Sequence, residues 1–133
     1  MIKLSRTNLD LGMVAYNTDE MLTFYRDVLA LPSDGSITMK GLGVLHKFLV
    51  GTNLVKVFVP EETPTPPPGG GMPGLHAGAR YWTAHVTNLD EILAALAKHG
   101  VLPVTGPNAA GPVIRWAIIN DPDGNGIEFV EGS

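Results

Sequence analysis

The sequence has no cysteine among its 133 residues and no cluster of Lys or Arg. Without cysteine there can be no disulfide scaffold, cysteine nucleophile or thiolate metal site, so any metal must be held by His, Asp or Glu. The formal net charge is -4, whereas nucleic acids and acidic membranes are bound by concentrated positive charge. We therefore expect no nucleic-acid or membrane partner, which leaves small molecules or other proteins.

Long apolar runs are missing from the N-terminal stretch, residues 1–11, which instead contains Lys3, Arg6 and Asp10. This stretch resembles neither a signal peptide nor a membrane span, and we expect a cytoplasmic protein. Hydrophobic residues make up 44% of the chain, which suits one globular domain with a moderate core.

What is present is an internal repeat. "YNTDEML" (Tyr16–Leu22) matches "TNLDEIL" (Thr87–Leu93), with equivalent asparagines 71 positions apart. "TNLVKVF" (Thr52–Phe58) matches "GNGIEFV" (Gly124–Val130) at an offset of 72. A repeat of this length predicts two copies of one supersecondary unit.

Each copy predicts a strand, a helix and three further strands. Asn17 and Asn88 are suitable N-caps, Glu20 and Glu91 can complete capping boxes, and Gly100 can end the second helix. Alternation predicts strands in both copies, at 9–16, 36–39, 44–50 and 52–58, and at 79–86, 102–105, 113–120 and 124–130.

Between the copies lies "PEETPTPPPGGGMPG" (Pro60–Gly74), too rich in Pro and Gly for a helix or strand. We expect one domain, 1–133, made of a module 1–59, a linker 60–78 and a module 79–133. The linker is either a plain surface connection or a mobile flap over a site.

The repeat, "FYRDVLAL" (Phe24–Leu31) and "DPDGNGIEFVE" (Asp121–Glu131) together resemble the vicinal oxygen chelate superfamily, which includes glyoxalases, bleomycin-resistance proteins and extradiol dioxygenases. The resemblance implies an α+β fold in which two βαβββ modules enclose a shared cavity. It also implies a homodimer and a small-molecule ligand.

In typical metal enzymes of this superfamily the first and last strand of each module supply ligands. The resemblance carries these positions onto Asp10, Lys56, Tyr81 and Glu128, of which Glu128 matches an expected ligand. A protonated lysine has no lone pair, and tyrosine, with an ordinary pKa near 10, is a poor ligand. We expect no cofactor; the alternative is a divalent metal held by Asp10, Glu128 and His85.

The same positions also predict a metal-free site in which Lys56 supplies the positive charge between Asp10 and Glu128. The alternative is that Lys56 and Asp10 form only a salt bridge at the rim. His85 shares a strand face with Tyr81 and is a catalytic candidate or a histidine of the cavity wall.

Two further residues are candidate substrate ligands. His46 lies on an early strand and faces either the cavity or the outer surface. Arg115 either clamps an anionic group or braces the turn at 121–125.

Three functions remain open. The first, which we favour, is a metal-independent isomerase, epimerase or lyase in which Glu128 or His85 moves a proton beside a carbonyl, while Lys56 or Arg115 stabilises the anion. The second is a binding protein that sequesters a drug or metabolite, like the bleomycin-resistance branch. The third is an atypical metal lyase or dioxygenase.

Overall fold

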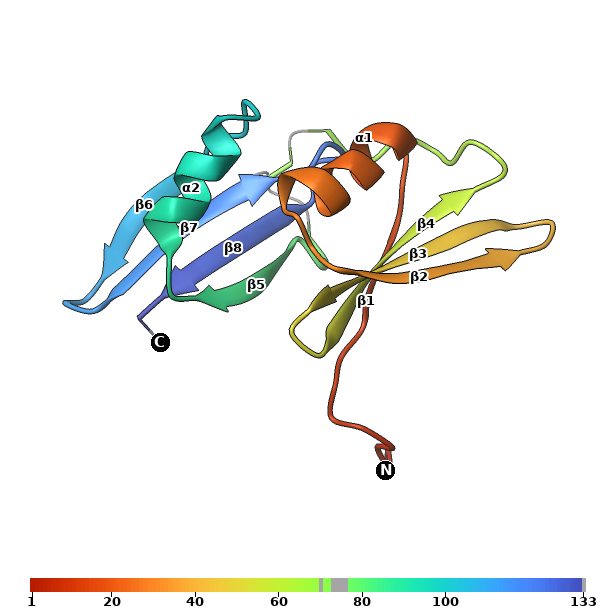
Figure 1. The fold of residues 1–133 in the computed structure, drawn as a ribbon, viewed down its shortest axis with the longest axis horizontal. Coiled ribbons are helices and arrows are strands. Elements are labelled where there is room, and N and C mark those ends of the chain that lie inside the picture. The colour runs from red at the N-terminus through yellow and green to blue at the C-terminus, as the bar shows by residue number, and fades with distance from the viewer. Residues whose placement is uncertain (70, 73–76, 133) are drawn as a thin grey trace. The chain divides into compact units, whose positions relative to one another are not determined.

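The structure is a computed structural model and describes residues 1–69, 71–72 and 77–132. It contains two units, Met1–Thr65 and Pro66–Ser133, and the boundary between them falls inside the Pro/Gly-rich segment. Each unit has its own four-stranded sheet (Figure 1). In the described part of the chain no helix is both long and apolar enough to cross a membrane.

The first unit contains one sheet, one helix and a π-helical turn. Its elements are β1 (Leu11–Val14), α1 (Thr18–Thr23), η1 (Phe24–Val28), β2 (Ser33–Met39), β3 (Gly43–Val50) and β4 (Asn53–Pro60). The strand order is β1-β4-β3-β2. β1 is parallel to β4, whereas the other neighbours are antiparallel.

The second unit repeats this topology. Its elements are β5 (Tyr81–Val86), α2 (Leu89–Ala97), β6 (Thr105–Ala110), β7 (Ile114–Asn120) and β8 (Gly126–Glu131). The order is β5-β8-β7-β6, again with a parallel pair formed by the first and last strands. The two predicted βαβββ modules are therefore confirmed.

One face of each sheet packs against the helix of its unit, because strand side chains alternate between faces. In the first unit Val57 on β4 and Met21 and Tyr25 on the helical segment are fully buried. The Tyr25 ring stacks on Phe48 with the ring centroids 6.4 Å apart. In the second unit the buried set comes from both the sheet and α2: Ile119, Ile127, Leu89 and Leu96.

The helices begin at the predicted residues but not with the predicted capping boxes. Asn17 and Asn88 occupy the N-cap positions without a side-chain hydrogen bond to the helix backbone. Glu91 instead accepts a hydrogen bond from the Asn88 side-chain amide, at 3.2 Å. The second helix ends as predicted, since Gly100 has a φ of 76° and the Val101 amide donates to the Leu96 carbonyl.

The strand expected at 102–105 was misplaced. The structure has β6 at Thr105–Ala110, "TGPNAA", whose Gly, Pro and Asn argue against a strand locally. Its pairing with β7, with a register shift between Thr105 and Asn108, makes it a strand. Tertiary hydrogen bonding here overrides intrinsic preference.

Candidate functional site

The face of the first sheet turned away from the helix carries the candidate binding site. Register fixes its members, because Gly12 pairs with Lys56 on β4, and Leu45 on β3 pairs with Phe58. Met39 lies on the same face, since it pairs with Gly43, two residues before Leu45. These residues come from all four strands of the sheet.

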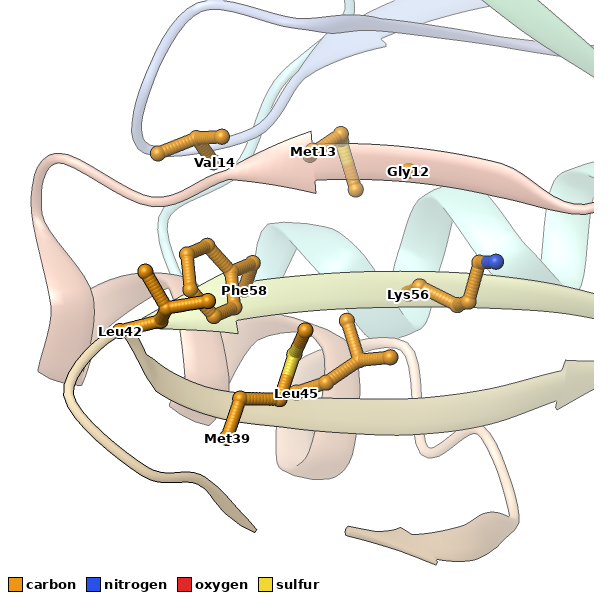
Figure 2. Close-up of a pocket in the computed structure, with 8 residues that line it drawn as sticks. All are labelled: Gly12, Met13, Val14, Met39, Leu42, Leu45, Lys56 and Phe58. Atoms are coloured by element: carbon orange, nitrogen blue, oxygen red, sulfur yellow. The ribbon is translucent and has the colours of Figure 1, made fainter. Parts of the chain in front are cut away.

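A pocket of about 350 Å³ opens on this face. Its described lining residues are Gly12, Met13, Val14, Met39, Leu42, Leu45, Lys56 and Phe58, of which Lys56 alone is charged. Figure 2 shows Lys56 beside Gly12 at one end, with Phe58, Leu42 and Met39 toward the other. The pocket is thus an apolar surface with one ammonium group at its edge.

Lys56 lies beside Asp10, as the positions carried over from the superfamily predicted. Its Nζ is 3.4 Å from Asp10 Oδ2, and the two side chains are 32% and 29% exposed. Lys47, which the sequence reasoning missed, lies directly opposite Lys56 in the register. It forms its own ion pair with Asp34, at 3.7 Å.

The second unit gathers Tyr81, Thr83, His85 and Glu128 on one face of its sheet. The predicted alternation along β5 is confirmed, and Thr83 pairs with Glu128 on β8. The Thr83 hydroxyl donates a hydrogen bond of 2.8 Å to Glu128 Oε1. Tyr81, at 53% exposure, and His85 are both exposed. This hydrogen bond orients the Glu128 carboxylate through its Oε1 atom.

The turn before β8 explains why Glu128 is so placed. Asp121 is buried, and its Oδ1 accepts hydrogen bonds from the backbone amides of Asp123 and Asn125. The Asn125 side-chain amide donates to both Asp121 carboxylate oxygens. "DPDGN" is therefore a turn organised around a single carboxylate, and it starts β8 in the register that pairs Glu128 with Thr83.

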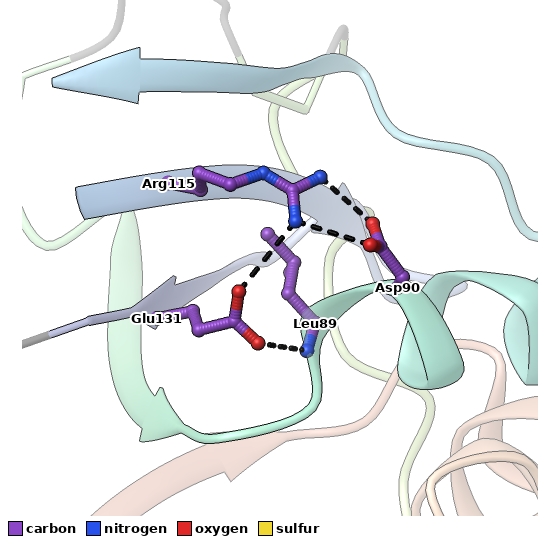
Figure 3. A network of polar contacts seen from close by, with 4 residues as sticks. All are labelled: Leu89, Asp90, Arg115 and Glu131. Carbon is purple, nitrogen blue, oxygen red and sulfur yellow. Dashed lines mark hydrogen bonds and ion pairs between the residues drawn. The ribbon is translucent and has the colours of Figure 1, made fainter. Parts of the chain in front are cut away.

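Arg115 lies on the other face of the second sheet, because it pairs with Glu131 and not with a residue in phase with Glu128. Its guanidinium makes a bidentate contact with Asp90 at 3.1 and 2.7 Å and is 3.5 Å from Glu131 (Figure 3). Glu131 in turn accepts a hydrogen bond from the Leu89 amide. These contacts brace the start of α2, and not the turn at 121–125.

This network also sets charge states. The hydrogen bond and the charge of Arg115 hold the pKa of Asp90 below its ordinary value of 3.8. Asp90 raises the pKa of Arg115 by the same two effects. An acidic residue in the first turn of α2 is favourable for the helix dipole as well.

His46 likewise lies on the helix-facing side of its sheet, because it pairs with Val57, whose side chain is fully buried. It is therefore on the opposite face from Lys56. His46 and Arg115 do not join the residues on the open faces of their respective sheets.

One of the four positions that the resemblance assigns to metal ligands carries a residue that cannot bind a cation. Lys56 places an ammonium group, which has no lone pair, next to the Asp10 carboxylate. Within the described residues of either unit, no three His, Asp or Glu side chains form a metal-binding group. Asp10 belongs to the first unit, and His85 and Glu128 to the second.

Sequence reasoning found Lys56 and Asp10 but missed Gly12, Phe58 and Lys47. Alternation along β4 carries Lys56 and Phe58 to one face and could have indicated Phe58. Gly12 and Lys47 depend on how β1 and β3 pair with β4, which only the register shows.

Comparison with known proteins gives one family and a common fold. The model of the Glyoxalase/Bleomycin resistance protein/Dioxygenase superfamily matches residues 10–129. No curated protein gives a significant match.

Solved structures similar to this chain cover nearly all of it. A glyoxalase family protein from Bacillus cereus has 18% identity and a TM-score of 0.80, over 98% of this chain and 95% of its own. A glyoxalase/dioxygenase from Nostoc punctiforme has 15% identity and a TM-score of 0.77, over 100% and 97%. An antibiotic-binding protein from a Streptomyces species has 18% identity and a TM-score of 0.70, over 98% and 100%. At these identities the likeness shows a common fold.

Proposed function

Because the chain belongs to the glyoxalase/bleomycin resistance/dioxygenase superfamily, we propose that it binds a small, largely apolar molecule in the pocket of its first unit. The observation that carries this proposal is the pocket itself, an apolar concavity of about 350 Å³ with one cationic group at its edge. Ligand sites are typically concave and apolar, with a few polar groups that set orientation, and have volumes of roughly 300–1,000 Å³.

Exposure of the pocket wall supports a ligand. Val14, Met39 and Leu42 are 57%, 39% and 59% exposed, although each contributes to the pocket. A ligand that covers such surface gains about 25 cal/mol for each Å² removed from water. One protein of the same fold is an antibiotic-binding protein. A binding role is consistent with this likeness, and the pocket, not the fold, carries the proposal.

Methionine methyl groups offer a direct test. Of the five methionines, Met39 lines the pocket, whereas Met21 is fully buried on the helical side of the sheet. The protein, labelled with ¹³C at the methionine methyls, is titrated with the neutral dye N-phenyl-1-naphthylamine. We expect saturable shifts of the Met39 signal and an unchanged Met21 signal. Absence of saturation, or equal shifts of both signals, would contradict the proposed site.

A second function, proton transfer beside a carbonyl, is favoured by one contact in the second unit. The Thr83 hydroxyl orients Glu128 at 2.8 Å, on the strand face shared with His85. A positioned carboxylate can act as a general base, and a neighbouring imidazole can return the proton.

Hydrogen–deuterium exchange at carbon tests this second function without knowledge of the product. A panel of small 2-substituted ketones and oxoacids is incubated with the protein in D₂O and followed by proton NMR. Catalysed exchange at the carbon beside the carbonyl should be abolished in Glu128→Gln and weakened in Thr83→Val, with dye binding retained. If dye binds but no compound exchanges, the protein is a binder and the catalytic role fails.

The expected homodimer and the absence of a cofactor stay predictions. Sedimentation equilibrium reports the first, and elemental mass spectrometry of untagged protein after exposure to zinc, nickel, manganese and ferrous iron reports the second. Near-stoichiometric metal that is lost in Glu128→Ala would restore a chelate mechanism.

A further inference from the structure

Two lysines lie side by side on the open face of the first sheet. Lys47 on β3 and Lys56 on β4 are direct register partners, so their Cβ atoms are separated by only about 5 Å. Their side chains are 23% and 32% exposed, which reduces the screening of their charges by water. Like charges directly opposite each other destabilise a strand pair, so this arrangement costs the fold stability.

The acidic partners lie on the outer strands and leave the centre of the row positive. Asp10 just before β1 pairs with Lys56, and Asp34 on β2 pairs with Lys47. Since the strand order is β1-β4-β3-β2, the row across the sheet reads acid, lysine, lysine, acid. Both N···O distances, 3.4 and 3.7 Å, exceed the roughly 2.7–2.9 Å of a strong charged hydrogen bond. Each ammonium group, with three donors, can still donate to a further acceptor.

The apolar pocket adjoins this row along the same strands. Phe58 follows Lys56 by two residues on β4, and Leu45 precedes Lys47 by two on β3; Phe58 and Leu45 are themselves register partners. Two residues along a strand span about 7 Å. The face therefore has a cationic centre and, about 7 Å away, an apolar floor that lines the pocket. Figure 2 shows Lys56 of this centre together with Phe58 and Leu45.

We infer that the ligand of this pocket is an amphipathic anion, whose carboxylate, sulfonate or phosphate group binds between Lys47 and Lys56 while its apolar body covers Leu45 and Phe58. This inference rests on the proposed binding function and adds the chemical class of the ligand. It also assigns a role to Lys47, which lies outside the lining of the apolar pocket.

Two dyes with the same aromatic body test the inference. N-Phenyl-1-naphthylamine is neutral, and 8-anilinonaphthalene-1-sulfonate adds one sulfonate. We expect the sulfonate dye to bind the wild-type protein roughly tenfold more tightly or better, and this preference to fall as salt is added. Lys47→Met and Lys56→Met should each remove most of the preference, and Lys47→Met, which changes no lining residue of the pocket, should leave the neutral dye nearly unaffected. Lys98→Met, an exposed lysine at the end of α2, is the control for net charge.

The outcomes separate the inference from the function on which it rests. If both dyes bind with equal affinity, or if Lys98→Met acts as strongly as the other two variants, the anion site is wrong while the pocket stands. If only Lys56→Met reduces the preference, the lysine pair is wrong. If neither dye binds, the proposed function itself fails. A sulfonate preference that is lost in both variants of the pair supports the inference.

Discussion

Gly12 lines the pocket, and a substitution at this position can show whether its lack of a side chain serves ligand binding. It lies within β1, at an ordinary strand φ, and a Cβ built on it meets no atom within 4 Å. Glycine in a strand interior lowers stability, because it costs backbone entropy and packs nothing. A larger residue at this position would add strand propensity, so its absence suggests that the space above Gly12 is needed.

The variant Gly12→Leu is expected to stabilise the protein while it weakens ligand binding. Strand propensity contributes up to about 1 kcal/mol, and half-burial of a leucine beside its register partner Lys56 about 1 kcal/mol more. A total near 1–2 kcal/mol corresponds to a rise in Tm of roughly 4–8 °C for a chain of this size. The four leucine carbons displace about as many ligand carbons, each worth ~0.8 kcal/mol, so the total of about 3 kcal/mol is a loss of roughly 200-fold in Kd.

Thermal unfolding and titration with N-phenyl-1-naphthylamine measure the two effects on the same samples. Gly69→Leu is the matched control, because Gly69 also has an ordinary φ and no atom within 4 Å of its built Cβ, and it does not line the pocket. A Gly12→Leu protein that binds the dye like wild type would refute the assigned pocket. A variant less stable than wild type would refute the account of open space above β1.

Three further variants test the rest of the structure. Arg115→Met should destabilise the protein near neutral pH. Because the folded pKa of Asp90 is lowered, the difference in unfolding free energy between variant and wild type, measured by denaturant titration, should shrink as the pH falls below about 3.8. A difference that stays constant with pH would contradict the pairing. Asp121→Ala leaves buried amide donors of the turn unpaired and should cost about 2–4 kcal/mol in unfolding free energy, with Asp121→Asn milder; equal losses in the two would argue against the turn geometry. Gly126→Ala places a methyl 2.6 Å from the Met72 Cγ and 2.9 Å from the Tyr81 Cβ and should cost about 1–3 kcal/mol in the same assay; a neutral result would contradict the tight packing at Gly126.

The carboxylates next to the lysine pair give a prediction of opposite sign. Asp10→Asn and Asp34→Asn each remove an acid that competes for an ammonium group. Affinity for 8-anilinonaphthalene-1-sulfonate should rise severalfold, with the neutral dye unchanged. Weaker sulfonate binding would mean that the carboxylates position the lysines more than they compete with an anion.

Local sequence signals predicted helices and strands correctly wherever the local preference of a segment agrees with its structure in the fold. The helices start at Asn17 and Asn88 as predicted, although neither side chain makes a capping hydrogen bond, and Gly100 ends the second helix because glycine adopts a positive φ at low cost. β6 escaped prediction because "TGPNAA" is held as a strand by its partner β7 and not by its own residues. The capping box at Glu91 did not form, because the Asn88 side-chain amide donates to Glu91 instead; the Leu89 amide at the start of α2 donates to Glu131, 42 residues away.

The residues of the candidate site were likewise predicted only in part. The positions carried over from the superfamily predicted that Asp10 and Lys56 lie together, and alternation placed Tyr81, Thr83 and His85 on one face. Neither could show that Arg115 faces α2 or that His46 faces the helical side of its sheet, because the face of a residue depends on strand register.

The sequence by itself determined the duplicated βαβββ order, the family resemblance and the residue types available for chemistry, since these depend on periodicity and on near neighbours. Only the tertiary structure decided that Lys47 stands opposite Lys56 and that Gly12 opens onto the pocket. Those contacts join residues on different strands, and the pairing register that creates them is set by burial of the whole sheet against its helix.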